Sequence, residues 1–210
     1  KNSNSELKSK KLDLLIAIKA SKELSDEIFK ENLFIKILNL SVELLNATKA
    51  ILLLYEITTL KIRAFKNEIL QEPIIVDSMP YENSKDLSHE IIKSVIESNK
   101  PYFINDIQDS EIDVSYLKKN NVKSLLSYPL IYRQKLIGIL YLESNISNQI
   151  FSEEKFDIIN IIMDQASVAL KNAILYSEME KRLIDRNHEI EQQVEENEVQ
   201  TEHLRLINRD

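Results

Sequence analysis

Apolar residues recur at two spacings along the chain, and these spacings predict where helices and strands form. Residues 6–24 and 31–46 repeat apolar positions three and four apart, as one face of a helix does. Short apolar or alternating runs predict strands at 50–56, 60–66, 72–77 and 101–106. The pattern therefore mixes both element types, and the strand at 72–77, with Pro73 at its start, is expected at a sheet edge.

The middle of the chain predicts two further helices. Residues 89–98 place Ile91, Ile92 and Val95 on one side, with Ser88 or Asp86 as the cap. A polar loop is expected before this helix, at 78–86. Residues 107–121 are predicted to form a loop and a short helix.

A β-hairpin is predicted over residues 124–144, with its turn near Arg133 and Gln134. Pro129 cannot donate a ladder hydrogen bond, so its arm is expected to contain a bulge or a missing bond. The second arm, 136–142, is apolar at every position. Both faces of this strand must therefore be covered, which predicts a central place in an antiparallel sheet.

That second arm contains Gly138, the only glycine in 210 residues. A missing side chain allows close backbone approach, so we expect the face that includes Gly138, with Leu136 on it, to pack against the terminal helices. Alternation then places Tyr141 and Glu143 on the opposite face.

A long helix is predicted from Ser152 onward, with Ser152 as the N-cap and Phe151 and Phe156 as a hydrophobic staple. Neither proline nor glycine interrupts residues 152–210. An unbroken helix of this length would span roughly 85 Å at about 1.5 Å per residue. Because its first half is apolar and its second half polar, we expect only the first half to pack on the domain.

A weak heptad pattern begins in the second half of this helix. Asn187 at a core position favours one register and two strands, and Arg186 can pair with Glu191 of a second helix. We therefore predict a parallel homodimer through residues 174–205, joined by the helix near residues 6–24. The predicted interface residues are Tyr176, Leu183, Asn187, Ile190, Val194 and Leu204.

Composition and charge narrow the function. The chain is 43% apolar and contains no cysteine, which excludes disulfides, thiolate chemistry and cysteine-based metal sites. Its three histidines lack metal-ligand spacing. Residues 152–210 hold 14 acidic and 7 basic residues and so carry the whole net charge of −7. We expect a cytoplasmic protein with neither a nucleic-acid partner, since no basic patch is present, nor a membrane span in this segment.

Several phrases, taken in order, resemble a GAF domain, the small-molecule sensor module of bacterial signalling proteins. They are "LLNATKAILLLYE", "NKPYFINDI", "VKSLLSYPLIYRQKLIGILYLESN" and "FSEEKFDIINIIMDQASVALKNAILYSEME". The resemblance covers about residues 12–180. It implies an α+β fold whose central antiparallel sheet, of about six strands, has terminal helices on one face and a ligand pocket on the other.

The resemblance also implies a domain organisation. We predict an N-terminal dimerisation helix over 1–25, a GAF sensor domain over 26–175 and a coiled-coil linker over 176–210. The linker would lead to an output domain such as a kinase, phosphatase or cyclase. The run "HEIEQQ" at 188–193 is similar to a kinase phospho-acceptor box, but it lacks the arginine and proline, so we interpret His188 as an exposed coiled-coil residue.

Missing residues argue against several known kinds of GAF domain. Bilin attachment and methionine-sulfoxide reduction in this family use cysteines, so we predict no cofactor. The cyclic-nucleotide pattern N-K…F-x-x-x-D-E is incomplete, because only Phe151 matches, Ser144-Asn145 stands for N-K and Lys155-Phe156 for D-E. Cyclic-nucleotide binding therefore stays an open alternative, and the ligand is an unknown small molecule.

Polar residues at the pocket side are the candidate ligand contacts. They are His89, Asn105, Asp106, Tyr128, Tyr141 and Glu143. Asn105 and Asp106 would lie at the rim, although Asn-Asp after a strand is also ordinary turn chemistry. We expect a sensory module without catalytic activity of its own; the alternative is a ligand-free structural dimerisation module.

Overall fold

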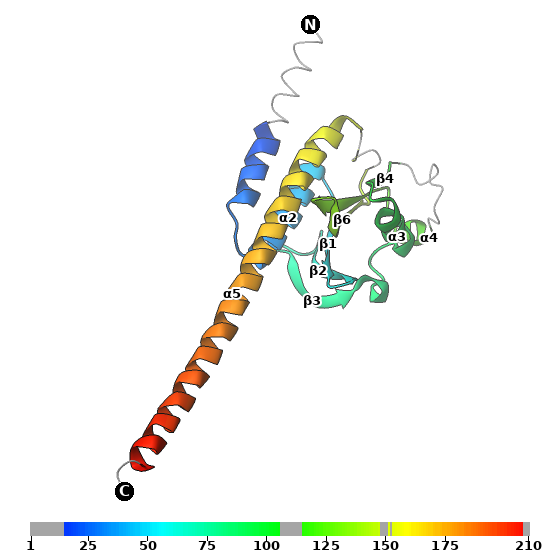
Figure 1. Ribbon diagram of the computed structural model, residues 1–210. Helices are drawn as coiled ribbons and strands as arrows, with labels where there is room; N and C mark the ends of the chain where they lie inside the picture. Colours follow the sequence, from blue (N-terminus) through cyan, green and yellow to red (C-terminus); the bar gives the residue numbers. More distant parts are fainter. Residues whose placement is uncertain (1–14, 106–114, 148–150, 152, 208–210) are drawn as a thin grey trace. The chain divides into compact units, whose positions relative to one another are not determined.

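A computed structural model describes residues 15–105, 115–147, 151 and 153–207 (Figure 1). After a helix whose described part covers residues 15–25, the elements are α2 (Lys30–Leu45), β1 (Lys49–Glu56), β2 (Thr59–Asn67), β3 (Ile74–Pro80), the 3-10 helix η1 (Tyr81–Asn83), α3 (His89–Ser98), β4 (Tyr102–Ile104), α4 (Ser115–Lys119), β5 (Ser124–Tyr132), β6 (Lys135–Ser144) and α5 (Glu153–Ile207). The segment expected to be a loop at 78–86 instead begins with the end of β3 and η1.

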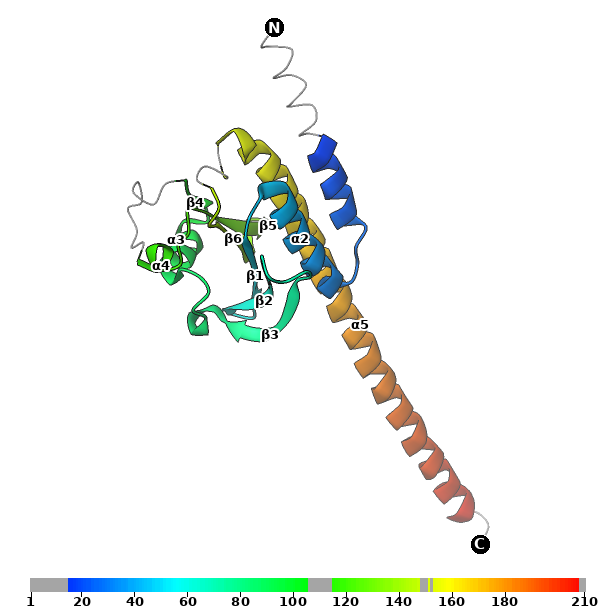
Figure 2. The same ribbon diagram turned by 180° about the vertical axis from the view of Figure 1, so that it is seen from behind.

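The six strands form one antiparallel sheet in the order β3-β2-β1-β6-β5-β4. The predicted α+β class is confirmed, as are the central place of β6 and the edge position of β3. Helix α2 and the first part of α5 lie on one side of the sheet, and α3 and α4 on the other (Figures 1 and 2).

The β5–β6 hairpin turns at the predicted residues. Arg133 and Gln134 both have positive φ, 49° and 63°, as a two-residue hairpin turn requires. The register shifts shortly beyond Pro129, because Leu130 pairs with Gly138 whereas Ile131 pairs with Leu136. The hairpin is thus irregular near Pro129, but the extra residue is in β6 and not in the arm that contains the proline, which corrects the expectation.

Gly138 lies on the predicted face, but the surface it approaches is different. It pairs with Leu54 of β1, on the face that also holds Leu140. A Cβ atom there would lie 2.6 Å from Leu54 Cδ2 and closer still to the carbonyl oxygen of Leu53. The close approach is therefore to the neighbouring strand and not to a helix, which corrects the expectation. Leu136 was also misplaced, because it packs against the cluster on the opposite face.

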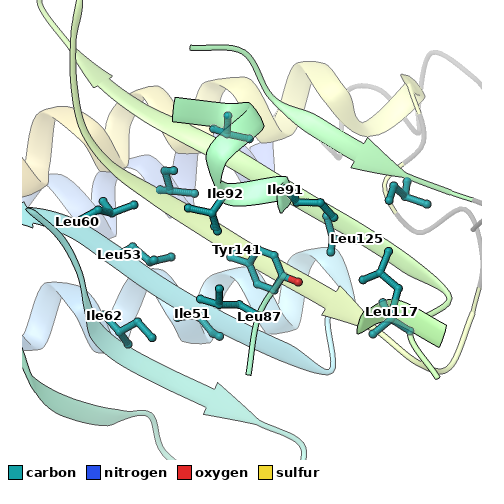
Figure 3. Close-up of a cluster of buried hydrophobic side chains, with 14 residues drawn as sticks. Ile51, Leu53, Leu60, Ile62, Leu87, Ile91, Ile92, Leu117, Leu125 and Tyr141 are labelled. Carbon is teal, nitrogen blue, oxygen red and sulfur yellow. The ribbon is translucent and has the colours of Figure 1, made fainter. Parts of the chain in front are cut away.

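The side of the sheet under α3 is filled by apolar side chains (Figure 3). Ile51, Leu53 and Tyr141 from the strands meet Ile91 and Ile92 from α3, and all five are fully buried. Leu87, Val95, Leu117, Leu125 and Ile139 belong to the same cluster. The described side chains of this cluster lie on the side of the sheet where the sequence predicted a ligand pocket.

Small apolar side chains are buried in the helices on the α2 side of the sheet. Ala17 and Ala20 of the N-terminal helix and Ala166 and Ala169 of α5 are all buried. Gln165 Nε2 of α5 donates a hydrogen bond of 2.6 Å to Ser25 Oγ at the end of the N-terminal helix. One window of α5 is long and apolar enough to cross a membrane by length and composition alone, and 44% of that window is buried inside the protein.

The start of α5 contacts the sheet, and its second part belongs to a separate compact unit. Phe156 packs against Phe103 of β4 with ring centroids 5.3 Å apart; the predicted cap Ser152 lies outside the described residues. Contacts divide the chain into two compact units, Lys1–Ala173 and Ile174–Asp210, joined by the unbroken helix α5.

Candidate functional site

A buried polar network lies where β1 begins and β6 ends. Lys49 and Glu143 are paired across these two strands, and Lys49 Nζ lies 2.8 Å from Glu143 Oε2. The Glu143 side chain is only 4% exposed and that of Lys49 is 19% exposed. A buried charge requires a partner, and this is the most buried ion pair among the described residues.

The network extends to the helices on the α3 side of the sheet. Tyr141 donates a hydrogen bond of 2.7 Å to Glu143 Oε1 and accepts one of 3.1 Å from the backbone N–H of Ser88, just before α3. Lys49 Nζ also donates to the hydroxyl of Tyr116 on α4 and to the carbonyl oxygen of Asp86, both at 3.0 Å. The network therefore joins β1 and β6 to α4 and to the N-terminus of α3.

Burial fixes the protonation state of the two phenols. It raises the pKa of Tyr141 well above its ordinary value, and the charge of Glu143 raises this pKa further. Burial and Glu143 also raise the pKa of Tyr116. Both hydroxyls thus stay protonated, so Tyr141 is a fixed donor to Glu143. Such groups stabilise and orient their partners, but they are poor proton donors or bases near neutral pH.

The structure brings together only some of the predicted pocket residues. Tyr141 and Glu143 are hydrogen-bonded to each other. His89 makes a different contact, because its Nε2 lies 2.8 Å from the carbonyl oxygen of Ser84. The side-chain oxygen of Asn105 is buried and, among the described residues, has no hydrogen-bond partner. Asp106 lies outside the described residues.

Tyr128 was placed on the wrong face of the sheet. It pairs with Leu140, and its hydroxyl donates a hydrogen bond of 2.8 Å to Asn160 Oδ1 of α5. The extra residue in β6 causes this difference, since an unbroken register from the turn would have paired Tyr128 with Ile139, on the Tyr141 face. Tyr128 therefore joins the sheet to the long helix.

A surface cavity of about 360 Å³ opens beside the polar network. It is lined by Thr48, Lys49, Asn67, Glu68, Ile69, Asn120, Val122, Glu143 and Asn145. Among these, the sequence had indicated only Glu143. A lysine before a buried strand was the available signal, but only the β1–β6 register shows that it meets Glu143. Across the described parts of the chain, no group of three or more His, Asp or Glu side chains is arranged to hold a metal ion.

The predicted dimer residues lie in the second compact unit, on the part of α5 after Ala173. Tyr176, Leu183, Ile190 and Val194 are all exposed, by 48–63% of their surface. Within its own helix, Arg186 pairs with Glu189 at 3.2 Å; the predicted pairing with Glu191 of a second helix stays a prediction. His188 is exposed and lies 3.6 Å from Glu191 Oε2. The Leu204 side chain is outside the described residues.

We expect Tyr128 to make the domain less stable in alkali. Burial, with a smaller effect of the Asp164 charge, raises its pKa to about 12, against about 10 in an unfolded chain. Between these values the unfolded chain loses a proton that the folded chain keeps, so the free energy of unfolding falls as pH rises, by about 1.4 kcal/mol per pH unit from this residue.

Urea unfolding of the parent protein and Tyr128→Phe, at about pH 9 and about pH 11, measures this effect against the ordinary tyrosine pKa. The free energy of unfolding should fall less between the two conditions in the variant than in the parent. The other buried tyrosines should still cause part of the fall in both proteins. An equal loss in both proteins would show that Tyr128 is not held protonated by the fold.

Known proteins share this fold. A sequence model of the GAF domain family matches residues 31–171. A segment of 73 residues is 45% identical to hybrid signal transduction histidine kinase G of Dictyostelium discoideum; it covers 34% of this chain but only 2% of that protein's length.

Solved structures agree with the family match. The GAF domain of the Acinetobacter phosphoenolpyruvate-protein phosphotransferase is 15% identical, with a TM-score of 0.60 over 80% of this chain and 98% of that one. The free methionine-R-sulfoxide reductase of Neisseria meningitidis, solved with its substrate, is 12% identical, with a TM-score of 0.58 over 77% and 89%. At such identities the likeness shows the fold alone.

Proposed function

Because the chain belongs to the GAF domain family, we propose that it is a sensory and regulatory module of a signalling protein. In this proposal the module binds a small molecule, dimerises through a parallel coiled coil and passes the signal to an output domain that follows it. The chain itself performs no catalysis. A cytoplasmic location stays a prediction.

The course of helix α5 carries this proposal. Its heptad stripe includes Ala166, Ala169 and Ala173, which are buried in the domain. The same stripe continues through Leu183 and Ile190, which are exposed. A regular stripe that begins in a core and continues in solvent is the pattern expected of a helix that meets a second copy of itself.

The identified relative supports a signalling role. It is a hybrid signal transduction histidine kinase, and the matched segment is 45% identical to this chain. A parallel coil brings two C-termini together, which suits a dimeric output domain. We propose that a small change in the register or splay of the paired helices transmits the signal.

The ligand-free alternative is favoured by one observation. The side of the sheet beneath α3 is filled by the apolar cluster around Tyr141, so a ligand there would have to displace protein. A module of this kind would serve only to dimerise and to connect neighbouring domains. Both candidates require the coiled coil, and they differ in whether a small molecule binds.

Single cysteines test the dimer, because the natural chain has none. We expect Leu183→Cys and Ile190→Cys each to form a disulfide between like positions under mild oxidation, since facing core positions of a parallel coil lie close together. Gln192→Cys, on the outer side of the same heptads, is the matched control and should cross-link poorly. Equal cross-linking at all three positions, or a monomer by light scattering at micromolar concentration, would contradict the proposed dimer.

A further inference from the structure

The surface cavity beside the polar network is formed by four separate segments. Thr48 lies just before β1, and the segment 67–69 lies at the end of β2. Asn120 and Val122 follow α4, and Glu143 and Asn145 lie at the end of β6. Its volume of about 360 Å³ falls within the range of roughly 300–1,000 Å³ that is typical of small-molecule sites.

Among the described residues that line the cavity, no cation is available for an anionic ligand. All three donors of Lys49 are engaged, by Glu143, by Tyr116 and by the carbonyl oxygen of Asp86. Lys49 and Glu143 also neutralise each other. The remaining charged residue of the lining is Glu68, for which no ion pair exists within the described part of the chain.

Several neutral side chains of the lining have hydrogen-bond donors or acceptors that no other described residue engages. The Asn120 amide nitrogen donates to the Tyr116 carbonyl oxygen, and the Asn145 amide nitrogen donates to Glu68 Oε1. Their two amide oxygens accept no hydrogen bond from any residue that the structure describes. In Asn67 the amide oxygen is the group that is engaged, because it accepts hydrogen bonds from the backbone N–H groups of Ile69 and Leu70. Its amide nitrogen donates to no other described residue.

The geometry points to a site for a small hydroxylated ammonium compound, and we propose that this cavity binds one. The Glu68 carboxylate receives the ammonium group, the amide oxygens of Asn120 and Asn145 accept from it or from hydroxyls, and the Asn67 amide donates to a hydroxyl. Ile69, 89% exposed, offers an apolar contact at the rim. This inference rests on the proposed sensory function, for which it names the ligand class and the site.

The location also suits signal output. Asn145 follows the last residue of β6, and α5 begins at Glu153. The start of this connection is tied to the sheet, because Lys123 Nζ donates to the Ile146 carbonyl oxygen and Ser124 Oγ to that of Ser147, both at 3.0 Å. A ligand that engages Asn145 therefore acts on the segment that leads from the sheet into the signalling helix.

D-glucosamine and D-glucose form a matched pair of probes, since they differ in the ammonium group alone. We would titrate each, at millimolar concentration, into the isotopically labelled full chain and follow amide chemical shifts. The expected result is that D-glucosamine shifts the signals of residues 67–69, 120–122 and 143–145, and that D-glucose binds at least about tenfold more weakly, because it lacks a charge-assisted hydrogen bond.

Glu68→Gln tests the assigned carboxylate while keeping an acceptor for Asn145. It should weaken D-glucosamine binding about tenfold, whereas Glu97→Gln, an exposed residue of α3 outside the cavity, should leave binding unchanged. The absence of shifts at the cavity, equal binding of the two sugars, or an unchanged affinity in Glu68→Gln would overturn the proposal. Cross-linking of Leu183→Cys, prepared as a separate variant, reports on the dimer independently, so the failure of this site and the failure of the proposed signalling function can be told apart.

Discussion

Replacing Lys49 with methionine is expected to lower the free energy of unfolding by about 3–5 kcal/mol, the cost of leaving a buried charge without its partner. Glu143 is 4% exposed and would lose its ion-pair partner while keeping the hydrogen bond from the hydroxyl of Tyr141. The loss of hydrogen bonds to Tyr116 and Asp86 adds to the effect. Chemical denaturation, with the slope of the transition compared between variants, measures it.

Two controls separate the buried charge from a general effect of losing lysine. Lys93→Met removes a lysine whose side chain is 72% exposed and which pairs with Glu97 at 3.9 Å, so it should cost less than about 0.5 kcal/mol. The double variant Lys49→Met with Glu143→Leu should recover much of the loss, because no charge is then buried alone. If Lys49→Met proves as mild as Lys93→Met, Glu143 is not the buried anion that the network implies.

Gly138→Ala is expected to destabilise the domain by about 1–3 kcal/mol or more, because the sheet has no room for even one methyl group. The added Cβ would meet the backbone carbonyl of Leu53, and a carbonyl within a strand cannot turn away as a flexible side chain can. Strands β1 and β6 would have to separate where Leu54 faces Gly138. Thermal and urea unfolding of the purified variant measure the loss.

Ser127→Ala is the matched control for a small change within the same hairpin. Its hydroxyl is buried and, among the described residues, has no hydrogen-bond partner, so removing it should leave stability unchanged or slightly raised. A neutral result for Gly138→Ala would mean that the strands can move apart, and the explanation of the single glycine would then be wrong.

Alternation of apolar residues was sufficient to predict most of the sheet. In β6 it placed Gly138 and Leu140 on the helical face and Tyr141 on the other, as the structure shows. The same reasoning failed for Tyr128 and Leu136. The extra residue of β6 lies between Leu136 and Gly138, so Leu136 faces the side opposite to the one that alternation predicts, and Tyr128 pairs one residue further along β6. Pro129 indicated an irregularity in the hairpin, but a proline does not tell which strand carries the additional residue.

The polar network could not be predicted from the sequence. Charged residues at strand ends are usually exposed, and Lys49 and Glu143 lie at such ends. Their pairing depends on the β1–β6 register and on α4, which brings Tyr116 to Lys49. The cavity depends on four separate segments, for which no local pattern exists.

The distance between two copies of a spin label tests the parallel coiled coil most directly. A single cysteine at Val199, which is 70% exposed on α5, gives one labelling site per chain, because the natural sequence has no cysteine. Pulsed electron paramagnetic resonance on the full chain should give one distance of about 20–30 Å, since paired helices lie about 10 Å apart and each label adds its own arm. An antiparallel coil centred on residues 174–205 would place the two labels roughly 28 Å apart along the axis at about 1.5 Å per residue, and the separation across the coil would bring the total distance above about 30 Å. A monomer would give no dipolar signal. Either result would contradict a parallel signalling dimer.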